Sequence, residues 1–450
     1  MAEKNGNFDT KIWQQRWKPK KYFIRKLGKK FGDSNAASLQ IDRKKVFKGL
    51  LKELETFAHE QFLFFYDGFG FNGQNPPFLE KSSIFPPEYV LKRTLDQTEY
   101  DHSVIEKAIL QRLDEDKVQA GQQADVLAYE ALRPALGILP FQTTTVLTYF
   151  QKNSEVLVVP YAEVALIGIS SSVIDVPENP IEGSDPGLDI RDYLAIPHEV
   201  GHYVYWRGVV NSQRLHVALR ERLIQAGLSD YLHWLEEIFA DVYSCIVAGP
   251  VVALSGQDLH LDNLPAEFTE DNGEHPARAI RPFIYLKTFE LLDAYREETA
   301  ALCERWTKKL SAFGNPSSFK LQPNNSTEKL IEMAQGKKDL EKIADVILKE
   351  VVDVKKGSWS KPFQGGDPLN LYTRFADKVY DDQTPLHRSN FDALQGKDTS
   401  NVGSPTTSWL YGLRQFKDTT KPQPVSLWTI VMNADGWGTG GPEEDGGSKD

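Results

Sequence analysis

Residues 189–208, with the sequence DIRDYLAIPHEVGHYVYWRG, contain the pattern that decides the fold around the candidate site. Gly208 is a typical C-terminal stop for a helix, so we expect a helix across this stretch. Pro197 lies inside it. Either the helix is kinked there, or its regular part begins at Pro197, whose fixed backbone angle suits a first turn. In both cases His198 and His202 are four residues apart, so their imidazoles leave one helical face.

A second predicted helix carries carboxylates at the same spacing. It begins at about Ser229, a suitable N-cap, and places Glu237 and Asp241 on one face. Glu236 is the alternative inward-facing residue. The position four residues after it is Ala240, which has no carboxylate, so the helical register favours Glu237.

Two histidines and one carboxylate are the ligand set of many catalytic zinc sites, which keep a fourth position open. His198, His202 and Glu237 are therefore the candidate ligands of one Zn²⁺ ion per chain. Glu199 points to the side of the open position, where a general base takes a proton from water without binding the metal. Asp241 is expected to accept the free ring N–H of a zinc histidine and to fix its orientation.

The segments around these two helices indicate a mostly helical α+β fold. Short runs rich in Thr, Val, Leu and Ile at 143–150, 155–160 and 163–170 predict a small mixed β-sheet. We expect it beside the helix that carries His198, Glu199 and His202, the HExxH pattern. Apolar residues recur at helical spacing in the remaining patterned segments, which are 43–66, 103–114, 122–133, 213–225, 283–311 and 327–351.

Positive charge is concentrated at the N-terminus. Residues 1–50 carry 14 Lys and Arg against 4 Asp and Glu, although the chain as a whole has a net charge of −11. Trp13, Trp17, Tyr22 and Phe23 are interleaved with these cations. We favour a basic segment that packs on the acidic body; the alternative is an arm that binds nucleic acid or an anionic membrane surface.

Length and composition exclude several classes of protein. The 450 residues exceed the roughly 250 to 300 at which one core usually stops growing, so we expect two lobes. The 40% hydrophobic content is that of a folded chain. Cys245 and Cys303 are the only cysteines, which excludes a disulfide framework and a cysteine zinc site. We find no secretory signal and no transmembrane segment, and therefore expect a cytoplasmic protein.

The pairing of HExxH with ExxxD, about 35 residues later, resembles the gluzincin metallopeptidases, of which thermolysin is the familiar member. The resemblance covers residues 160–290 at most. It implies the zinc ligands, base and orienting carboxylate named above, and hydrolysis of peptide bonds by a water molecule that the zinc activates. It also implies that a strand at 163–170 binds the extended backbone of the substrate, through Ala165, Leu166, Ile167 and Gly168.

The donor that stabilises the oxyanion is less clearly indicated, because the usual donor motifs of the family are not matched. Residues 274–282 open a later helix and place His275 and Arg281 where the chain can return to the cleft. Either side chain could donate to the oxyanion. The alternative is that the segment only begins a helix and forms a structural salt bridge.

These patterns divide the chain into a basic arm at 1–42, a helical lobe at 43–140, a zinc metallopeptidase core at 141–290, a mainly helical lobe at 291–425 and a flexible acidic tail at 426–450. The expected substrate is a peptide or protein. Two alternatives remain: a zinc hydrolase of a non-peptide amide or ester, and a non-enzymatic binding protein with a basic N-terminal arm. About one tightly held zinc per chain is expected for the enzymes alone.

Overall fold

The computed structural model describes residues 11–33, 41–73, 77–79, 85–141, 143–171, 191–259, 267–293, 295–323 and 327–353. Most of the C-terminal lobe expected at 291–425 and the whole tail expected at 426–450 therefore lie outside the described residues. The described part is mostly helical and contains three small sheets, which confirms the α+β class. No helix in these ranges combines the length and the apolar character needed to cross a bilayer.

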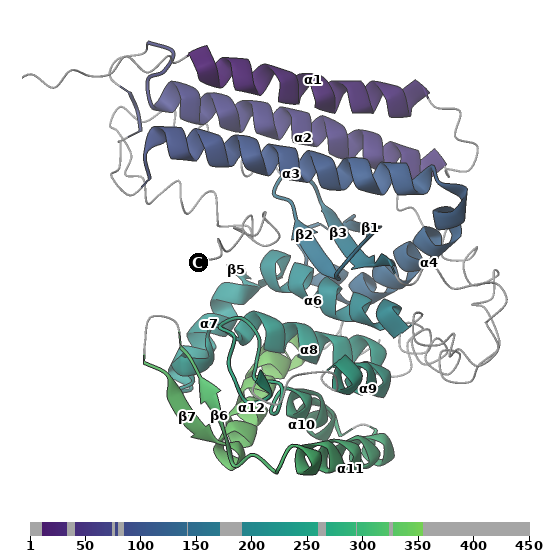
Figure 1. The fold of residues 1–450 in the computed structure, drawn as a ribbon, viewed down its shortest axis with the longest axis vertical. Coiled ribbons are helices and arrows are strands. Elements are labelled where there is room, and N and C mark those ends of the chain that lie inside the picture. Colours follow the sequence, from purple (N-terminus) through teal and green to yellow (C-terminus); the bar gives the residue numbers. More distant parts are fainter. Residues whose placement is uncertain are drawn as a thin grey trace, which may run out of the picture.

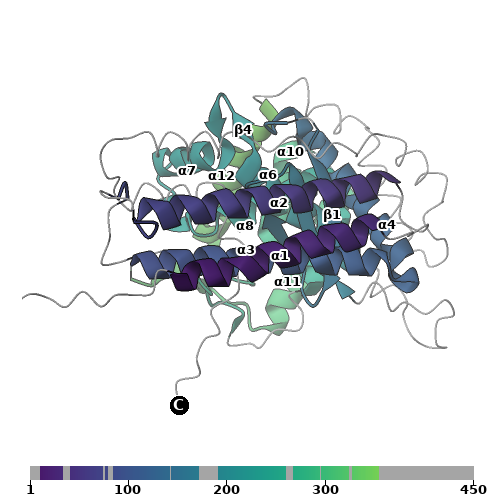
Figure 2. The ribbon, with the colours of Figure 1, turned by 90° about the horizontal axis from the view of Figure 1, so that it is seen from above.

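Three long helices form one layer, which we call the helical layer: α1 (Lys11–Asp33), α2 (Ile41–Gly68) and α3 (Pro87–Arg112). In Figures 1 and 2, α1 lies across the other two on the side away from the sheet. Trp17 and Phe31 of α1 are buried in the same core as the apolar side chains of α2 and α3. The favoured prediction that the basic segment packs on the body is confirmed for α1. The boundary expected at residue 42 does not separate two cores, because α1 shares one core with α2 and α3.

A three-stranded sheet lies beneath the helical layer and consists of β1 (Thr145–Gln151), β2 (Glu155–Val158) and β3 (Val164–Ser170). The strand order is β1-β3-β2, with β3 parallel to β1 and antiparallel to β2. Side chains alternate between the two faces of a strand. Leu157 and Leu166 accordingly join the core of the helical layer, whereas their neighbours join the core on the opposite face, as Val156, Val158, Ala165 and Ile167 do.

The central position of β3 corrects one prediction. Residues 165–168 of β3 pair with β2 on one side and with β1 on the other. The prediction that Ala165, Leu166, Ile167 and Gly168 offer a free edge to a substrate is therefore wrong. The outer strands are β1 and β2, and the short connection from β2 to β3 allows these two strands to pair antiparallel.

The two helices of the candidate site lie under the sheet. The first is α6 (Ile196–Arg207), which follows the 3-10 turn η3 (Arg191–Ala195) and has Pro197 in its first turn. The regular helix thus starts at the proline, which was one of the two alternatives. The second is α8 (Leu235–Ala248), which starts later than expected because Ser229 begins a separate 3-10 turn, η4 (Ser229–Tyr231).

The other elements pack around these two helices. The segment expected as one helix at 283–311 is two, because Asp293 and Tyr295 take left-handed backbone angles (φ 50° and 55°). The segment expected as a helix from 327 starts instead as a strand. The remaining elements are α4 (Glu115–Leu132), η1 (Arg133–Gly137), β4 (Val209–Val210), β5 (Gln213–Arg214), α7 (Leu215–Gln225), α9 (Pro250–Leu259), α10 (Pro282–Leu292), α11 (Arg296–Ala312), β6 (Ser318–Leu321), β7 (Lys329–Glu332), α12 (Met333–Leu348) and η6 (Lys349–Asp353).

The two faces of the sheet separate two hydrophobic cores. One core joins the helical layer to the upper face of the sheet, and the other joins the lower face to α6, α8, α10 and α12. α4 contributes Leu127 and Leu132 to the lower core, although we expected it in the N-terminal helical lobe. Along the chain, the passage from the upper core to the lower one therefore occurs at α4, which precedes the three strands in sequence.

Candidate metal centre

A glycine allows α6 and α8 to approach closely. A Cβ atom on Gly201 would lie 2.8 Å from the Cα atom of Ala240, which is closer than real Cβ contacts. The two helices consequently lie close together around this contact. His198 and His202 of α6 and Glu237 of α8 thus point into one space.

The distances among these three side chains suit a zinc ion. The Nε2 atoms of His198 and His202 lie 3.1 Å apart, and each is 3.4 Å from one carboxylate oxygen of Glu237. In a tetrahedral site with zinc–ligand bonds of about 2.0 to 2.1 Å, ligand atoms lie about 3.3 Å from one another. Within the described ranges, these residues form the one His, Cys, Asp and Glu group close enough to hold a metal ion.

Each histidine is oriented by a different carboxylate. Asp241 Oδ1 lies 3.0 Å from His198 Nδ1, as expected for the residue four positions after Glu237. Glu236 Oε1 lies 2.9 Å from His202 Nδ1 and also accepts a hydrogen bond from the indole nitrogen of Trp206 at 2.8 Å. Contacts at Nδ1 leave both Nε2 atoms for the metal. Glu236 was considered only as a rival ligand, so its orienting role was missed.

Arg281 binds two of the carboxylates. Its Nε donates to Asp241 at 2.8 Å, and its Nη2 donates to Asp241 at 3.0 Å and to Glu237 at 2.9 Å. The hydroxyl of Tyr285 donates to Asp241 at 2.8 Å. Of the two roles left open for Arg281, the structural salt bridge is therefore the one observed, and its guanidinium is engaged instead of free for an oxyanion.

The charges of the cluster compensate one another. Burial alone would raise the pKa of Asp241, but Arg281 and His198 hold it below its usual value. Burial opposes a charged His198, yet Asp241 and Glu237 raise its pKa to about 10. The metal-free cluster thus carries protons on its ring nitrogens, and a divalent cation would replace them.

Glu199 occupies a different environment from the other acids. It is buried, and burial is the main cause that raises its pKa, with further contributions from Glu237 and Glu155. It lines a cavity of about 380 Å³ together with His198 and Glu237. A carboxylate with a raised pKa beside an accessible cavity has the properties of a general base.

The cavity has walls of different character. The β1–β2 turn contributes polar side chains, and α9 contributes an apolar wall beside Leu194. Volumes of about 300 to 1,000 Å³ are usual for ligand sites. The residues that form these two walls are Lys152, Asn153, Ser154, Val252, Ser255, Gly256 and Leu259.

His275 lies at the mouth of the cavity. Its side chain is 43% exposed, and its Nε2 lies 3.6 Å from Glu237 Oε1. Asn272 fixes the position of His275. The side-chain oxygen of Asn272 accepts a hydrogen bond from the backbone N–H of His275 at 2.7 Å, and the amide nitrogen of Asn272 lies 3.2 Å from His275 Nδ1. Burial lowers the pKa of His275. Of the two predicted oxyanion donors, His275 is the one whose ring is open to the cavity.

A buried aspartate fixes the segment that carries His275. Asp271 accepts hydrogen bonds from His233 Nε2 at 2.8 Å, Trp234 Nε1 at 3.0 Å, and the backbone N–H groups of Gly273 at 2.8 Å and Gln322 at 2.7 Å. His233 precedes Glu237 by one helical turn, but its ring nitrogen faces Asp271. It is therefore a structural residue that joins the start of α8 to this segment.

The chain was compared with known protein families, with curated proteins and with solved structures, and none of them matches it. The site is therefore interpreted from its own geometry.

Proposed function

We propose that this protein is a zinc-dependent metallopeptidase with a two-lobed, gluzincin-type arrangement, in which His198, His202 and Glu237 hold one Zn²⁺ ion. The convergence of the two Nε2 atoms and the Glu237 carboxylate at separations of 3.1 to 3.4 Å carries the proposal. Bound there, zinc would polarise the scissile carbonyl and acidify a water molecule.

Different side chains of the protein carry out the remaining steps of the proposed reaction. Glu199 takes the proton from the attacking water and returns it to the leaving amine. Its buried position and raised pKa favour both transfers. His275 donates from its exposed ring to the oxygen on which negative charge develops. Asp241, Glu236 and Arg281 position the ligands and do not touch the substrate.

The walls of the cavity support a peptide as substrate. β2 is an outer strand of the sheet, so its backbone can pair with an extended peptide; this role was assigned to β3 from the sequence. Glu155 begins β2 directly after the turn that lines the cavity. The apolar wall of α9, with Val252 and Leu259, suits an apolar substrate side chain.

The decisive experiment is Glu199→Gln, compared with the parent chain for zinc content and for cleavage of a peptide mixture. We expect about one zinc per chain in both proteins and a loss of cleavage of roughly 10²- to 10⁴-fold in the variant, the usual contribution of a general base. Glu304→Gln is the matched control, because Glu304 forms an exposed pair with Lys308. It should retain both properties.

Each other outcome contradicts a different part of the proposal. Unchanged cleavage in Glu199→Gln removes Glu199 as the base. A parent chain that binds zinc but cuts no peptide excludes the peptide substrate and favours a non-peptide amide or ester. A parent chain that binds no zinc after exposure to the metal excludes the metal centre itself.

A further inference from the structure

The outer face of α1 is a strongly basic surface. α1 contains nine Lys and Arg and a single acid, Asp33, so its net charge is +8. The net charge of the whole chain is −11, which leaves −19 for the remainder. Its apolar side chains face α2 and α3 and fix how the helix is rotated. Six lysine and aromatic residues between positions 18 and 30 of the helix are exposed. We call them the α1 ridge: Lys18, Tyr22, Phe23, Lys26, Lys29 and Lys30.

The positive charge of the α1 ridge is not neutralised by neighbouring acids. Lys20 and Arg25, on the flanks of α1, form ion pairs with Glu99 of α3 and Glu55 of α2. No ion pair within the described ranges involves any of the four ridge lysines. The two cations on the flanks of α1 are thus paired with acids, whereas the four ridge lysines keep their charge unpaired within the described ranges.

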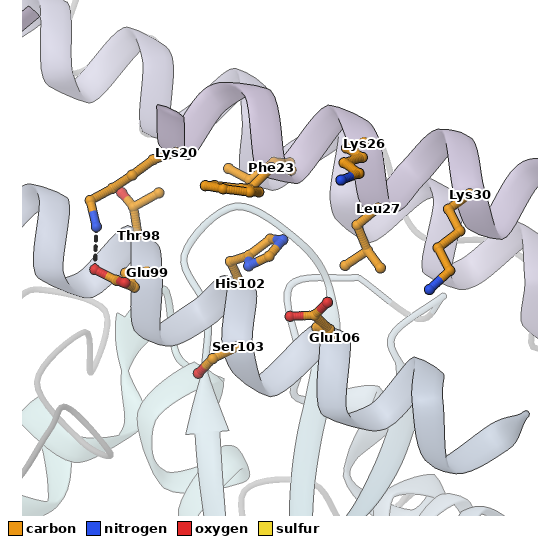
Figure 3. A pocket seen from close by; sticks show the side chains of 11 residues that line it. Lys20, Phe23, Lys26, Leu27, Lys30, Thr98, Glu99, His102, Ser103 and Glu106 are labelled. Atoms are coloured by element: carbon orange, nitrogen blue, oxygen red, sulfur yellow. Dashed lines mark hydrogen bonds and ion pairs between the residues drawn. The ribbon is translucent and has the colours of Figure 1, made fainter. Parts of the chain in front are cut away.

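A pocket between α1 and α3 is a weaker candidate for an anion site. It has a volume of about 480 Å³, and it is lined by Lys20 and by three residues at the α3 edge of the ridge, which are Phe23, Lys26 and Lys30. Figure 3 shows that Lys20 reaches Glu99 and that Glu106 projects from α3 on the opposite wall. These carboxylates oppose an anion inside the pocket. An anionic partner is therefore expected on the outside of α1.

Two aromatic side chains stand among the ridge lysines. Tyr22 is 60% exposed and Phe23 is 51% exposed, although large apolar side chains elsewhere in the chain are mostly buried. Their rings meet edge to face, with centroids 5.7 Å apart. Lys26 lies over the ring of Tyr22, with its Nζ 6.0 Å from the centroid. Aromatic rings flanked by lysines are typical of helices that lie at a membrane–water interface.

The character of these residues favours a lipid surface over nucleic acid. The ridge cations are all lysines, which act as point charges, whereas Arg16 lies over Trp13 and Arg25 is paired with Glu55. Bidentate phosphate recognition in nucleic acids relies mainly on arginine. The edge-to-face contact of the two rings also gives no parallel platform on which successive bases could stack. A helix of 23 residues is about 35 Å long, so its lysines are spread over a length that can contact many lipid headgroups.

We propose that the α1 ridge binds the surface of an anionic lipid bilayer. The four lysines lie against the headgroups, and Tyr22 and Phe23 enter the headgroup region. The acidic remainder of the chain is repelled by the same surface, so the protein is held with α1 towards the lipid. In this orientation the sheet and the helical layer separate the metal centre from the bilayer.

The test is sedimentation of the full chain with two kinds of vesicle, phosphatidylcholine alone and phosphatidylcholine in which about a third of the lipid is phosphatidylserine. We expect binding to the second kind only, and its loss when salt is raised from about 0.1 to about 0.5 M. Each lysine near such a surface contributes about fivefold to binding. The variant with Lys18, Lys26, Lys29 and Lys30 changed to Gln should therefore bind at least about a hundredfold more weakly.

Two further variants isolate the ridge from net charge. The control changes four exposed lysines elsewhere to Gln, and it should bind as the parent does; these are Lys308, Lys329, Lys342 and Lys349. Tyr22→Ser keeps the charge and should reduce binding several-fold. Thermal unfolding of all variants checks that α1 remains packed. The Glu199→Gln protein should bind vesicles normally, because this proposal is independent of the metal centre.

Three results would overturn the proposal. The first is no binding of the parent chain to anionic vesicles at low salt. The second is equal loss of binding in the control variant, which would show that net charge and not the ridge is responsible. The third is displacement of the protein from vesicles by single-stranded or duplex DNA at equal phosphate concentration, which would identify nucleic acid as the partner.

Discussion

The pKa values of two buried aspartates in this protein are shifted in opposite directions. Asp241 in the metal centre and Asp101 in the helical layer are 0% and 1% exposed. Arg281 and His198 keep the pKa of Asp241 below its usual value. Burial raises the pKa of Asp101 to about 7. Asp101 receives a hydrogen bond from Gln97 at 2.8 Å, and no ion pair within the described ranges involves it.

The difference teaches how the fold retains charge in its interior. Burial alone raises the pKa of a carboxylate, as it does at Asp101, because an isolated ion is costly away from water. A buried carboxylate stays ionised only where a cation and further donors surround it. The carboxylates around His198 and His202 are supplied with such partners, which agrees with the proposal that they surround a metal ion.

The largest effect should come from removing the cation beside Asp241. Arg281→Met leaves Asp241 and Glu237 buried without their guanidinium partner, and breaking a buried pair in this way costs about 3 to 5 kcal/mol. We expect that loss in the free energy of unfolding, measured in urea with a chelator present. Arg278→Met is the control, since Arg278 forms a surface pair with Glu267 and should cost less than about 1 kcal/mol. An equal loss in the free energy of unfolding in both variants would contradict the inference that Arg281 compensates the buried charges of Asp241 and Glu237.

At Asp101 we expect a substitution to increase the free energy of unfolding, whereas Arg281→Met decreases it. Between about pH 4 and pH 7 the folded chain keeps a proton on Asp101 that the unfolded chain has lost, so this group makes unfolding easier as the pH rises. A shift of about three units corresponds to at most ~4 kcal/mol. Asp101→Asn should therefore stabilise the protein by roughly 2 to 4 kcal/mol at pH 8 and by much less at pH 4.

A paired aspartate near the helical layer provides the control for that prediction. Asp125 is buried and accepts hydrogen bonds from Arg112 at 3.0 Å and from the backbone and hydroxyl of Thr148, both at 2.8 Å. Asp125→Asn should destabilise the protein, because it leaves Arg112 uncompensated. Chemical unfolding of both variants at pH 4 and pH 8 measures the contrast, and the same sign in both would refute it.

A smaller effect is expected at the carboxylate that orients His202. Glu236→Gln keeps the shape of the side chain but weakens its contact with His202 Nδ1. Loss of such a partner usually lowers metal affinity 10- to 100-fold. Competition with a chromophoric zinc chelator measures this change. Glu221→Gln, at an exposed position on α7, should leave the affinity unchanged; unchanged affinity in Glu236→Gln would show that His202 is oriented by other contacts.

The smallest effect is expected for one hydrogen bond within the cluster. Tyr285→Phe removes a donor to the charged Asp241 but leaves Arg281 and His198 in place, and should cost about 1.5 kcal/mol. Tyr243→Phe removes a buried hydrogen bond to a neutral acceptor, the carbonyl of Ala131, and should cost less, about 1 kcal/mol. Thermal unfolding of the metal-free proteins compares the two. A larger loss at Tyr243 would mean that the charge of Asp241 adds nothing to its hydrogen bond.

Sequence alone predicted those parts of the site that depend on helical periodicity. His198 and His202, and Glu237 and Asp241, are four residues apart, and a helix brings such pairs to one face in any fold. The structure places all four where this spacing requires. Glu236 was missed because its role depends on which way the second nitrogen of His202 points, and no spacing within one helix contains that information.

Features that depend on distant partners were predicted less well. The order of strands in a sheet is set by contacts between segments, so the central position of β3 could not be read from its own residues. The sequence favoured a basic segment that packs on the acidic body, but it did not show that this segment shares one core with α2 and α3. Trp13, Trp17, Ile24, Leu27 and Phe31 nevertheless recur at helical spacing, and this signal was enough to predict that α1 packs on the helical layer.

The strand order of the sheet has a consequence for how the chain folds during synthesis. β1 and β2 are made first but do not pair with each other, since β3 lies between them. Both strands must therefore wait until residue 170 has left the ribosome, whereas the helical layer can form earlier from local contacts. The helical layer would then act as a template, because Leu147, Leu157 and Leu166 pack on it from the three strands. α6 and α8, which carry the candidate metal centre, follow β3 in the chain and are therefore synthesised after the three strands.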